Sequence, residues 1–223
     1  MTPLFANRRE AARQLAQKLQ NLSGAPHLIV LGLPRGGVPV AATVAQALGA
    51  ELDVFVVRKL GVPGHEELAM GAVASGGIRV VNEETFHALG ISRHTLDAVT
   101  EAESREVIRR ERLYRGDRPF PDLRGATVVL VDDGVATGST MLAGLRALRE
   151  HRPAKLVAAA PVMSRQAEHD LARVADACVT VATPEPFYGV GAWYGDFTQT
   201  TDAEVLAALQ QAHTGGLADA AQR

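Results

Sequence analysis

The sequence predicts an α/β fold in which helices cover both faces of a Rossmann-like, mostly parallel sheet. Three observations lead to this prediction. Apolar, β-branched segments typical of buried strands alternate with segments of helical periodicity along most of the 223 residues. The hydrophobic fraction of 47% is sufficient for a sizeable core. Polar and glycine-containing loops follow several of the strands, at the edge where open parallel sheets bind their ligands.

The expected elements follow this alternation in chain order. Residues 7–21 are expected to form a helix because Ala11, Leu15 and Leu19 would lie near one face. Two short strands, at 69–74 and 78–82, are expected to pair as a hairpin around Ser75-Gly76-Gly77. Buried strands are expected at 27–33, 53–58, 128–131, 155–162 and 178–182. Further helices are expected at 38–48, 92–114, 141–150 and 164–175.

Charge and composition restrict the classes of function. A net charge of −2 gives no general attraction to nucleic acid or to an anionic membrane, so neither is expected as a partner. The single cysteine, Cys178, lies in an apolar run and cannot form an intrachain disulfide. No apolar run approaches the length of a membrane span, and the first residues lack a signal-peptide core. A cytoplasmic protein is therefore expected.

The most informative segment is the block from 128 to 140. Its apolar strand ends in two adjacent carboxylates, Asp132 and Asp133. A loop of small and hydroxylic residues and a predicted helix N-terminus follow, and together they suit a phosphate group. Two carboxylates beside such a cradle suit a polyol or a magnesium ion. The block therefore predicts a sugar-phosphate site, since an ordinary capped turn explains each half but not their combination.

The run from Val129 to Thr140 resembles the signature with which type I phosphoribosyltransferases bind phosphoribosyl pyrophosphate (PRPP). The resemblance implies that Asp132 and Asp133 bind the ribose hydroxyls and hold Mg²⁺, either directly or through PRPP. Dimers are common in this family, which makes a homodimer a further expectation. The residues implied to wrap the 5-phosphate are Ala136, Thr137, Gly138, Ser139 and Thr140.

A second loop is expected at the same edge of the sheet. Pro34, Arg35, Gly36 and Gly37 follow the first strand and precede a helix. The two glycines would let backbone amides close on an anion, and Arg35 adds a positive charge. The segment resembles the pyrophosphate loop of the family, although a plain strand-to-helix turn would explain it if it stood alone.

A basic pair, Arg58 and Lys59, ends the strand expected at 53–58. Fixed cations at this place could stabilise the charge of a leaving pyrophosphate. The resemblance implies that both act in catalysis together with Asp133. It also implies a mobile loop near 59–69 that closes as a lid.

Aromatic residues gather late in the chain, where five of the ten lie between 187 and 197. In the resembled family a small hood covers the acceptor, which makes Phe187, Tyr188, Trp193 and Tyr194 candidates for stacking on an acceptor base. A plug that anchors the C-terminal segment explains the cluster equally well. The expected domain division is a core of 23–182, a hood of 1–22 plus 183–213, and a flexible tail of 214–223.

The expected helix at 92–114 is rich in arginine. A glutamate stands four residues before Arg105, Arg110 and Arg115, which is the favourable order for ion pairs along a helix. The spacing predicts a salt-bridged solvent face or a dimer surface rather than a nucleic-acid site.

Together these motifs predict transfer of 5-phosphoribose from PRPP to a nitrogenous base or amine in nucleotide metabolism or salvage. Ala136 stands where the 6-oxopurine transferases have an aspartate, which argues against hypoxanthine or guanine handled through that residue. A non-catalytic PRPP- or nucleotide-binding regulator on the same fold is the alternative. A hydrolase or kinase is disfavoured because neither a nucleophile motif nor an ATP loop is present.

Overall fold

The computed structural model describes the backbone of residues 2–220 and their side chains except at 67 and 213–220. A parallel sheet of five strands, in the order β2-β1-β6-β7-β8, lies at its centre. This sheet confirms the α/β fold expected from the sequence. Its strands are β1 Leu28–Gly32, β2 Glu51–Val54, β6 Thr127–Val131, β7 Lys155–Val162 and β8 Ala177–Ala182.

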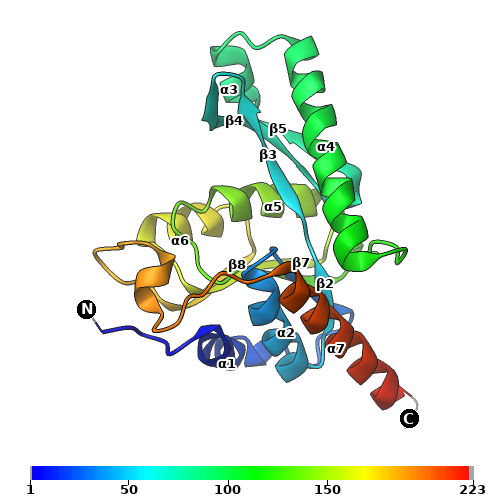
Figure 1. The fold of residues 1–223 in the computed structure, drawn as a ribbon, viewed down its shortest axis with the longest axis vertical. Helices are drawn as coiled ribbons and strands as arrows, with labels where there is room; N and C mark the ends of the chain where they lie inside the picture. Colours follow the sequence, from blue (N-terminus) through cyan, green and yellow to red (C-terminus); the bar gives the residue numbers. More distant parts are fainter. Residues whose placement is uncertain (1, 221–223) are drawn as a thin grey trace.

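Helices cover both faces of this sheet (Figure 1). On one face lie α1 Arg8–Lys18, α2 Gly37–Leu48 and α7 Asp202–Ala220, and on the other lie α5 Ser139–Glu150 and α6 Arg165–Ala172. Helix α7 continues into the tail expected from residue 214, whereas 221–223 lie outside the described residues. Within residues 2–220, no helix combines the length and the apolar character needed to cross a membrane.

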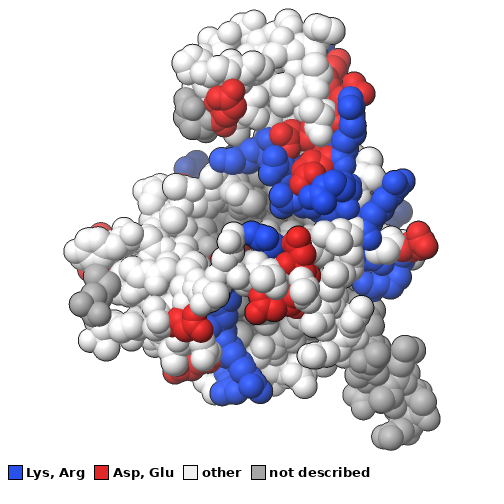
Figure 2. Space-filling view, in the orientation of Figure 1, with Lys and Arg blue, Asp and Glu red and all other residues white. Residues whose placement is uncertain are grey.

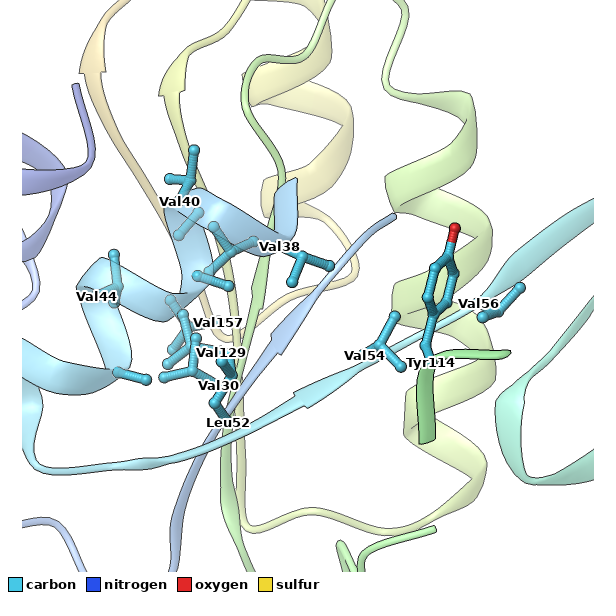
Figure 3. Close-up of a cluster of buried hydrophobic side chains, with 14 of the residues drawn as sticks. Val30, Val38, Val40, Val44, Leu52, Val54, Val56, Tyr114, Val129 and Val157 are labelled. Atoms are coloured by element: carbon cyan, nitrogen blue, oxygen red, sulfur yellow. The ribbon is translucent and has the colours of Figure 1, made fainter. Parts of the chain in front are cut away.

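The packing of α2 on the sheet explains why the apolar strands form its centre. Val30, Val129 and Val157 stand at the same level on the adjacent strands β1, β6 and β7. Val44 of α2 belongs to the same buried cluster (Figure 3). Strands covered on both faces carry continuous apolar runs, and β-branched side chains on neighbouring strands pack as a row.

An arm projects from this core (Figure 1). Its strands β4 and β5 pair antiparallel across Ser75–Gly77, which confirms the expected hairpin. The expected long helix is also confirmed, and the Ser92 side chain caps it by accepting the N–H of Thr95. The elements of the arm are β3 Val57–Val62, β4 His65–Ala74, β5 Ile78–Val81, α3 Glu83–Ala88 and α4 Arg93–Arg115.

The single strand expected at 53–58 is wrong. Strand β2 ends at Val54, and the chain then enters β3 in the antiparallel sheet. Between the two strands, the Val56 N–H donates to Ser75 Oγ of the arm at 2.9 Å. Residues on both sides of this change are buried in apolar surroundings, so hydrophobicity alone could not mark where the chain leaves one sheet for the other.

Residues 59–69 form a hairpin rather than the expected loop. Strands β3 and β4 pair over most of the segment, with register shifts near Gly61. Gly64 lies in the connecting turn with a φ of 82°, a conformation that glycine adopts without strain. The mobility of this segment stays a prediction.

The two segments expected to form a hood meet beside the sheet. Phe5 pairs with Tyr194, and the Gly195 N–H donates to the Phe5 carbonyl oxygen at 2.8 Å. The helices of these segments lie elsewhere, since α1 and α7 pack on α2 and on the central sheet. Residues 2–8 and 183–202, which include the first residue of each of these helices, are therefore the parts that remain beside the carboxyl edge of the sheet, and their role as a hood stays a prediction.

A buried ion pair joins the arm to the edge of the central sheet. Arg115, at the end of α4, places its Nε 3.0 Å from Asp53 Oδ2 of β2, and the two side chains are only 4% and 5% exposed. Arg115 also donates to the Val54 carbonyl oxygen at 2.9 Å. The expected pair with Glu111 forms as well, at 3.0 Å. The sequence predicted only this last contact.

Replacing Arg115 with Met is expected to lower the free energy of unfolding by about 3–5 kcal/mol, because Asp53 would keep a buried charge without its partner. Urea denaturation followed by circular dichroism measures the change. The matched control is Arg112→Met, one turn away on an exposed part of α4, which we expect to change stability by less than about 0.5 kcal/mol. Similar losses in both variants would contradict the role of the buried pair.

Candidate active site

The candidate site lies where β1 and β6 end. These strands are hydrogen-bonded neighbours, so the loops that follow them lie side by side at the carboxyl edge of the sheet. A Cβ added to Gly36 would overlap the carboxylate of Asp133, and one added to Gly37 would lie 2.6 Å from the Val131 carbonyl oxygen. The absence of side chains at both glycines therefore brings the predicted pyrophosphate loop into contact with the predicted ribose-binding acids.

Arg8, the first residue of α1, reaches the same carboxylate. Its Nε donates to Asp133 Oδ2 at 2.7 Å, and its Nη1 donates to the Thr198 carbonyl oxygen at 2.7 Å. The guanidinium also lies over the ring of Phe197, 3.9 Å from its centre. The Tyr194 hydroxyl donates to the carbonyl oxygen of Asp133. Both the N-terminal helix and the C-terminal segment are thus attached to Asp133.

The two acids have perturbed proton affinities. Burial, with a further contribution from the neighbouring charge of Asp133, raises the pKa of Asp132 well above its usual range. Burial also raises the pKa of Asp133, and the hydrogen bond from Arg8 opposes that rise. The Asp132 carboxylate accepts the N–H of Asp133 at 2.9 Å. The pair is therefore an acid cluster whose full ionisation is unfavourable without a bound partner.

The predicted phosphate cradle forms the first turn of α5. Gly138, in the left-handed conformation with a φ of 76°, precedes the helix. The hydroxyl groups of Thr137 and Ser139 lie 3.0 Å apart, and both residues are exposed, as are Ala136 and Thr140. The first N–H groups of a helix have no partner within the helix, so this exposed turn can bind an anion.

A cavity of about 850 Å³ adjoins Asp133. The loop after β1, the last turns of α4 and the segment from residue 190 onward form its walls. Lys and Arg side chains gather over the lower part of α4, beside the hollow between arm and core (Figure 2). The arginines that line the cavity are Arg8, Arg35, Arg109 and Arg110. The charge of these walls suits an anionic ligand.

Arg58 and Lys59 do not line this cavity. They are adjacent on β3, so their side chains point to opposite faces of the arm. Arg58 Nε lies 2.6 Å from Glu103 Oε2 on α4, a contact that raises the pKa of the guanidinium. Lys59 instead lines a smaller cavity of about 280 Å³ beside Ser139 of α5. Their expected position at the end of the second parallel strand is wrong, and their catalytic role stays a prediction.

Most of the aromatic cluster serves packing. Trp193 and Tyr194 are buried in a small apolar group with Phe5. Phe187 packs against Trp193 with ring centres 6.3 Å apart, whereas Tyr188 is 66% exposed. These positions support the plug that the sequence left as one of two explanations. Stacking of the four candidate residues on an acceptor stays a prediction.

The family described as the phosphoribosyl transferase domain matches residues 4–189, which include both loops and both acids. The chain belongs to this family.

Two curated relatives of this phosphoribosyl transferase domain come from Mycobacterium tuberculosis, strains CDC 1551 and H37Rv, and are provisionally named phosphoribosyl transferases. Each is 46% identical to it over 210 residues, which are 94% of this chain and 47% of the relative. The chain thus spans about half the length of the curated relatives it matches. The crystal structure of TT1426 from Thermus thermophilus is 42% identical, with a TM-score of 0.85, and the match covers 93% of this chain and 98% of that one.

Several residues that line the cavity of this phosphoribosyl transferase domain could not be predicted from the sequence. No sequence pattern indicated a role for Arg8, because helical periodicity does not show that the first residue of a helix contacts an acid 125 residues later. The spacing predicted an ion pair between Glu106 and Arg110, and this pair forms at 2.7 Å. The same spacing does not indicate that Arg110 also lines the cavity. The aromatic run could have drawn attention to Phe197, which was not singled out although it lines the cavity.

The acids suit a magnesium ion that arrives with a phosphorylated ligand. Among the described residues, no group of three or more His, Cys, Asp or Glu side chains could hold a metal. Mg²⁺ commonly binds through one or two carboxylates together with substrate phosphates and water. Asp132 and Asp133 meet that requirement only if the ligand supplies the remaining oxygens.

Replacing Asp132 with Asn is expected to raise the melting temperature by a few degrees at pH 7.5. The folded-state pKa of Asp132 lies above the unfolded value of about 4, so its charge lowers stability as pH rises from about 4 through the folded pKa. The gain should therefore shrink as the pH is lowered toward 4. Differential scanning calorimetry across this range measures it.

The control variant is expected to shift the melting temperature in the opposite direction. Arg149 lowers the pKa of Asp176, so Asp176→Asn is expected to lower the melting temperature at pH 7.5. A loss of stability in Asp132→Asn at pH 7.5 would contradict an unfavourable charge at that position.

Proposed function

We propose that the protein transfers 5-phosphoribose from PRPP to the nitrogen of a base or amine and releases pyrophosphate. The contact between Gly36 and Asp133 is the observation that carries this proposal. PRPP has a phosphate, a pair of ribose hydroxyls and a pyrophosphate. The first turn of α5, the two acids and the loop 34–37 offer matching groups in this order along one edge of the sheet. Membership of the phosphoribosyl transferase domain family supports the assignment.

In the proposed complex, the 5-phosphate binds at Thr137–Thr140 and the ribose hydroxyls bind at Asp132 and Asp133. Asp133 Oδ2 already accepts a hydrogen bond from Arg8, so a ribose hydroxyl would bind Oδ1 or displace the guanidinium. The pyrophosphate would lie against the backbone amide of Gly36 and the side chain of Arg35, while the Gly37 N–H donates to the Leu33 carbonyl oxygen at 3.0 Å and holds the loop closed. Ionisation of the acids, unfavourable in the free protein, is then favoured by the hydroxyl donors.

The reaction breaks the bond between ribose C1 and the pyrophosphate oxygen and forms a bond from C1 to the acceptor nitrogen. The electron pair of the broken bond leaves with pyrophosphate, and the acceptor nitrogen loses a proton. Negative charge therefore grows on the leaving group, and amides and arginines already in place stabilise it without reorganisation. Mg²⁺ bound with PRPP would neutralise part of the same charge.

The acceptor would approach from the cavity beside Asp133, whose lining includes Phe197. Ala136 cannot exchange a proton with a purine nitrogen, so any proton acceptor for the nucleophile must come from another group. A panel of purine, pyrimidine and pyridine bases, assayed with Mg²⁺ for PRPP-dependent release of pyrophosphate, identifies the acceptor class. Binding of PRPP without release on any acceptor would favour the non-catalytic regulator.

Asp133→Asn is expected to lower PRPP-dependent pyrophosphate release by about 100-fold or more, because the ribose site would lose a charged hydrogen-bond acceptor. The fold should persist, since an amide oxygen can still accept from Arg8. Asp117→Asn, at an exposed position after α4, is the matched control and should retain the wild-type rate. Unchanged turnover in Asp133→Asn, with circular dichroism confirming the fold of both variants, would refute this role of Asp133.

A further inference from the structure

We propose that Arg110, assisted by Arg109, binds the pyrophosphate of PRPP from the side of α4, in the role that the sequence assigned to Arg58 and Lys59. The inference rests on the proposed function and goes beyond it, because it identifies the residues that complete the pyrophosphate subsite. It follows from the walls of the large cavity, the anchoring of α4 and the distribution of charge.

The cavity has the predicted pyrophosphate loop on one side and α4 on another. Pro34, Arg35 and Gly36 contribute the first wall, and Arg109 and Arg110 contribute the second. A pyrophosphate bound at the loop would therefore lie in the same cavity as the two α4 arginines. Arg58, which pairs with Glu103, does not line this cavity, and Lys59 lines the smaller cavity on the opposite face of β3.

The last turns of α4 are fixed against the core, so the arginines have a defined position. Tyr114 stands four residues after Arg110 on the same side of the helix. Its ring lies among the buried valines Val54 and Val56, and its hydroxyl points out of that cluster (Figure 3). The hydroxyl donates to Asp202 Oδ1 at 2.6 Å, and burial together with this contact raises the pKa of Tyr114 to about 12.

The charges that line the whole cavity leave an excess of positive charge for a ligand, because four arginines, Arg8, Arg35, Arg109 and Arg110, stand against two carboxylates, Asp133 and Asp202. Arg109 and Arg110 both pair with one carboxylate, Glu106, at 2.7 Å. Two guanidinium groups lower the pKa of Glu106 to about 2, so it carries one full negative charge against their two positive charges. Arg35, across the cavity, makes no ion pair with any residue that the structure describes. Guanidinium groups bind phosphate oxygens through paired hydrogen bonds, which suits them to a pyrophosphate.

The test measures how the whole protein binds each of the two halves of PRPP, pyrophosphate and ribose 5-phosphate. Isothermal titration calorimetry with Mg²⁺-pyrophosphate, and separately with ribose 5-phosphate, gives one dissociation constant for each half. In Arg110→Gln we expect the dissociation constant for pyrophosphate to rise about tenfold, and more in the double variant Arg109→Gln/Arg110→Gln. The constant for ribose 5-phosphate should stay unchanged. The matched control is Arg105→Gln, which removes an exposed ion pair with Glu101 on the same helix and should change neither constant.

Glu106→Gln separates ligand binding from a merely structural role. If Arg110 served only to pair with Glu106, both substitutions would have similar effects. Because Glu106 competes with the ligand for the two arginines, Glu106→Gln is instead expected to tighten pyrophosphate binding.

Unchanged pyrophosphate binding in the double variant, or a loss in Arg58→Gln without one in Arg110→Gln, would overturn the inference and leave the proposed function intact. A wild-type protein that binds neither pyrophosphate nor ribose 5-phosphate would overturn both.

Discussion

The ion pair between Arg8 and Asp133 is the contact on which the arrangement of the site depends. It joins the first turn of α1 to the end of β6, and the same guanidinium lies against Phe197 in the C-terminal segment. Gly36 lies against the same carboxylate oxygen, Oδ2, without leaving room for a side chain. Four segments that are distant in the sequence thus meet at one residue. Their relative positions are set by a charge and by a close backbone approach, together with the apolar packing of Phe5 against Trp193 and Tyr194.

The acid cluster illustrates how a binding site can oppose folding. Asp132 and Asp133 follow a strand that is buried along its whole length, and the same burial raises the pKa of both carboxyl groups. A ligand with hydroxyl groups and a cation would relieve this unfavourable charge. Relief of this unfavourable charge would therefore contribute to the free energy of ligand binding.

The sequence predicted the central sheet, the hairpin at Ser75–Gly77, the long helix and the two loops that meet at Asp133. These features depend on local signals, namely apolar strands, helical periodicity, helix caps and glycine-containing turns. It could not predict that the apolar run after Asp53 divides between two sheets. It also could not predict the neighbours of Arg8 or Arg110, because contacts between distant segments leave no trace in spacing. Local pattern thus predicted the two loops and the acids that meet at Asp133, whereas tertiary packing determined the opposite wall of the cavity.

The contact between Tyr114 and Asp202 joins the segment after residue 189 to the cavity wall that α4 forms. The matched segment of the family ends at residue 189, but Phe197, Thr200 and Asp202 lie beyond it and still line the cavity. The groups proposed to bind the donor all lie inside the matched segment. Their supports extend beyond it, because Tyr194 donates to the Asp133 carbonyl oxygen and Asp202 accepts from Tyr114. Substitutions after residue 189 that change the shape of the cavity would therefore also disturb the positions of Asp133 and of the arginines on α4.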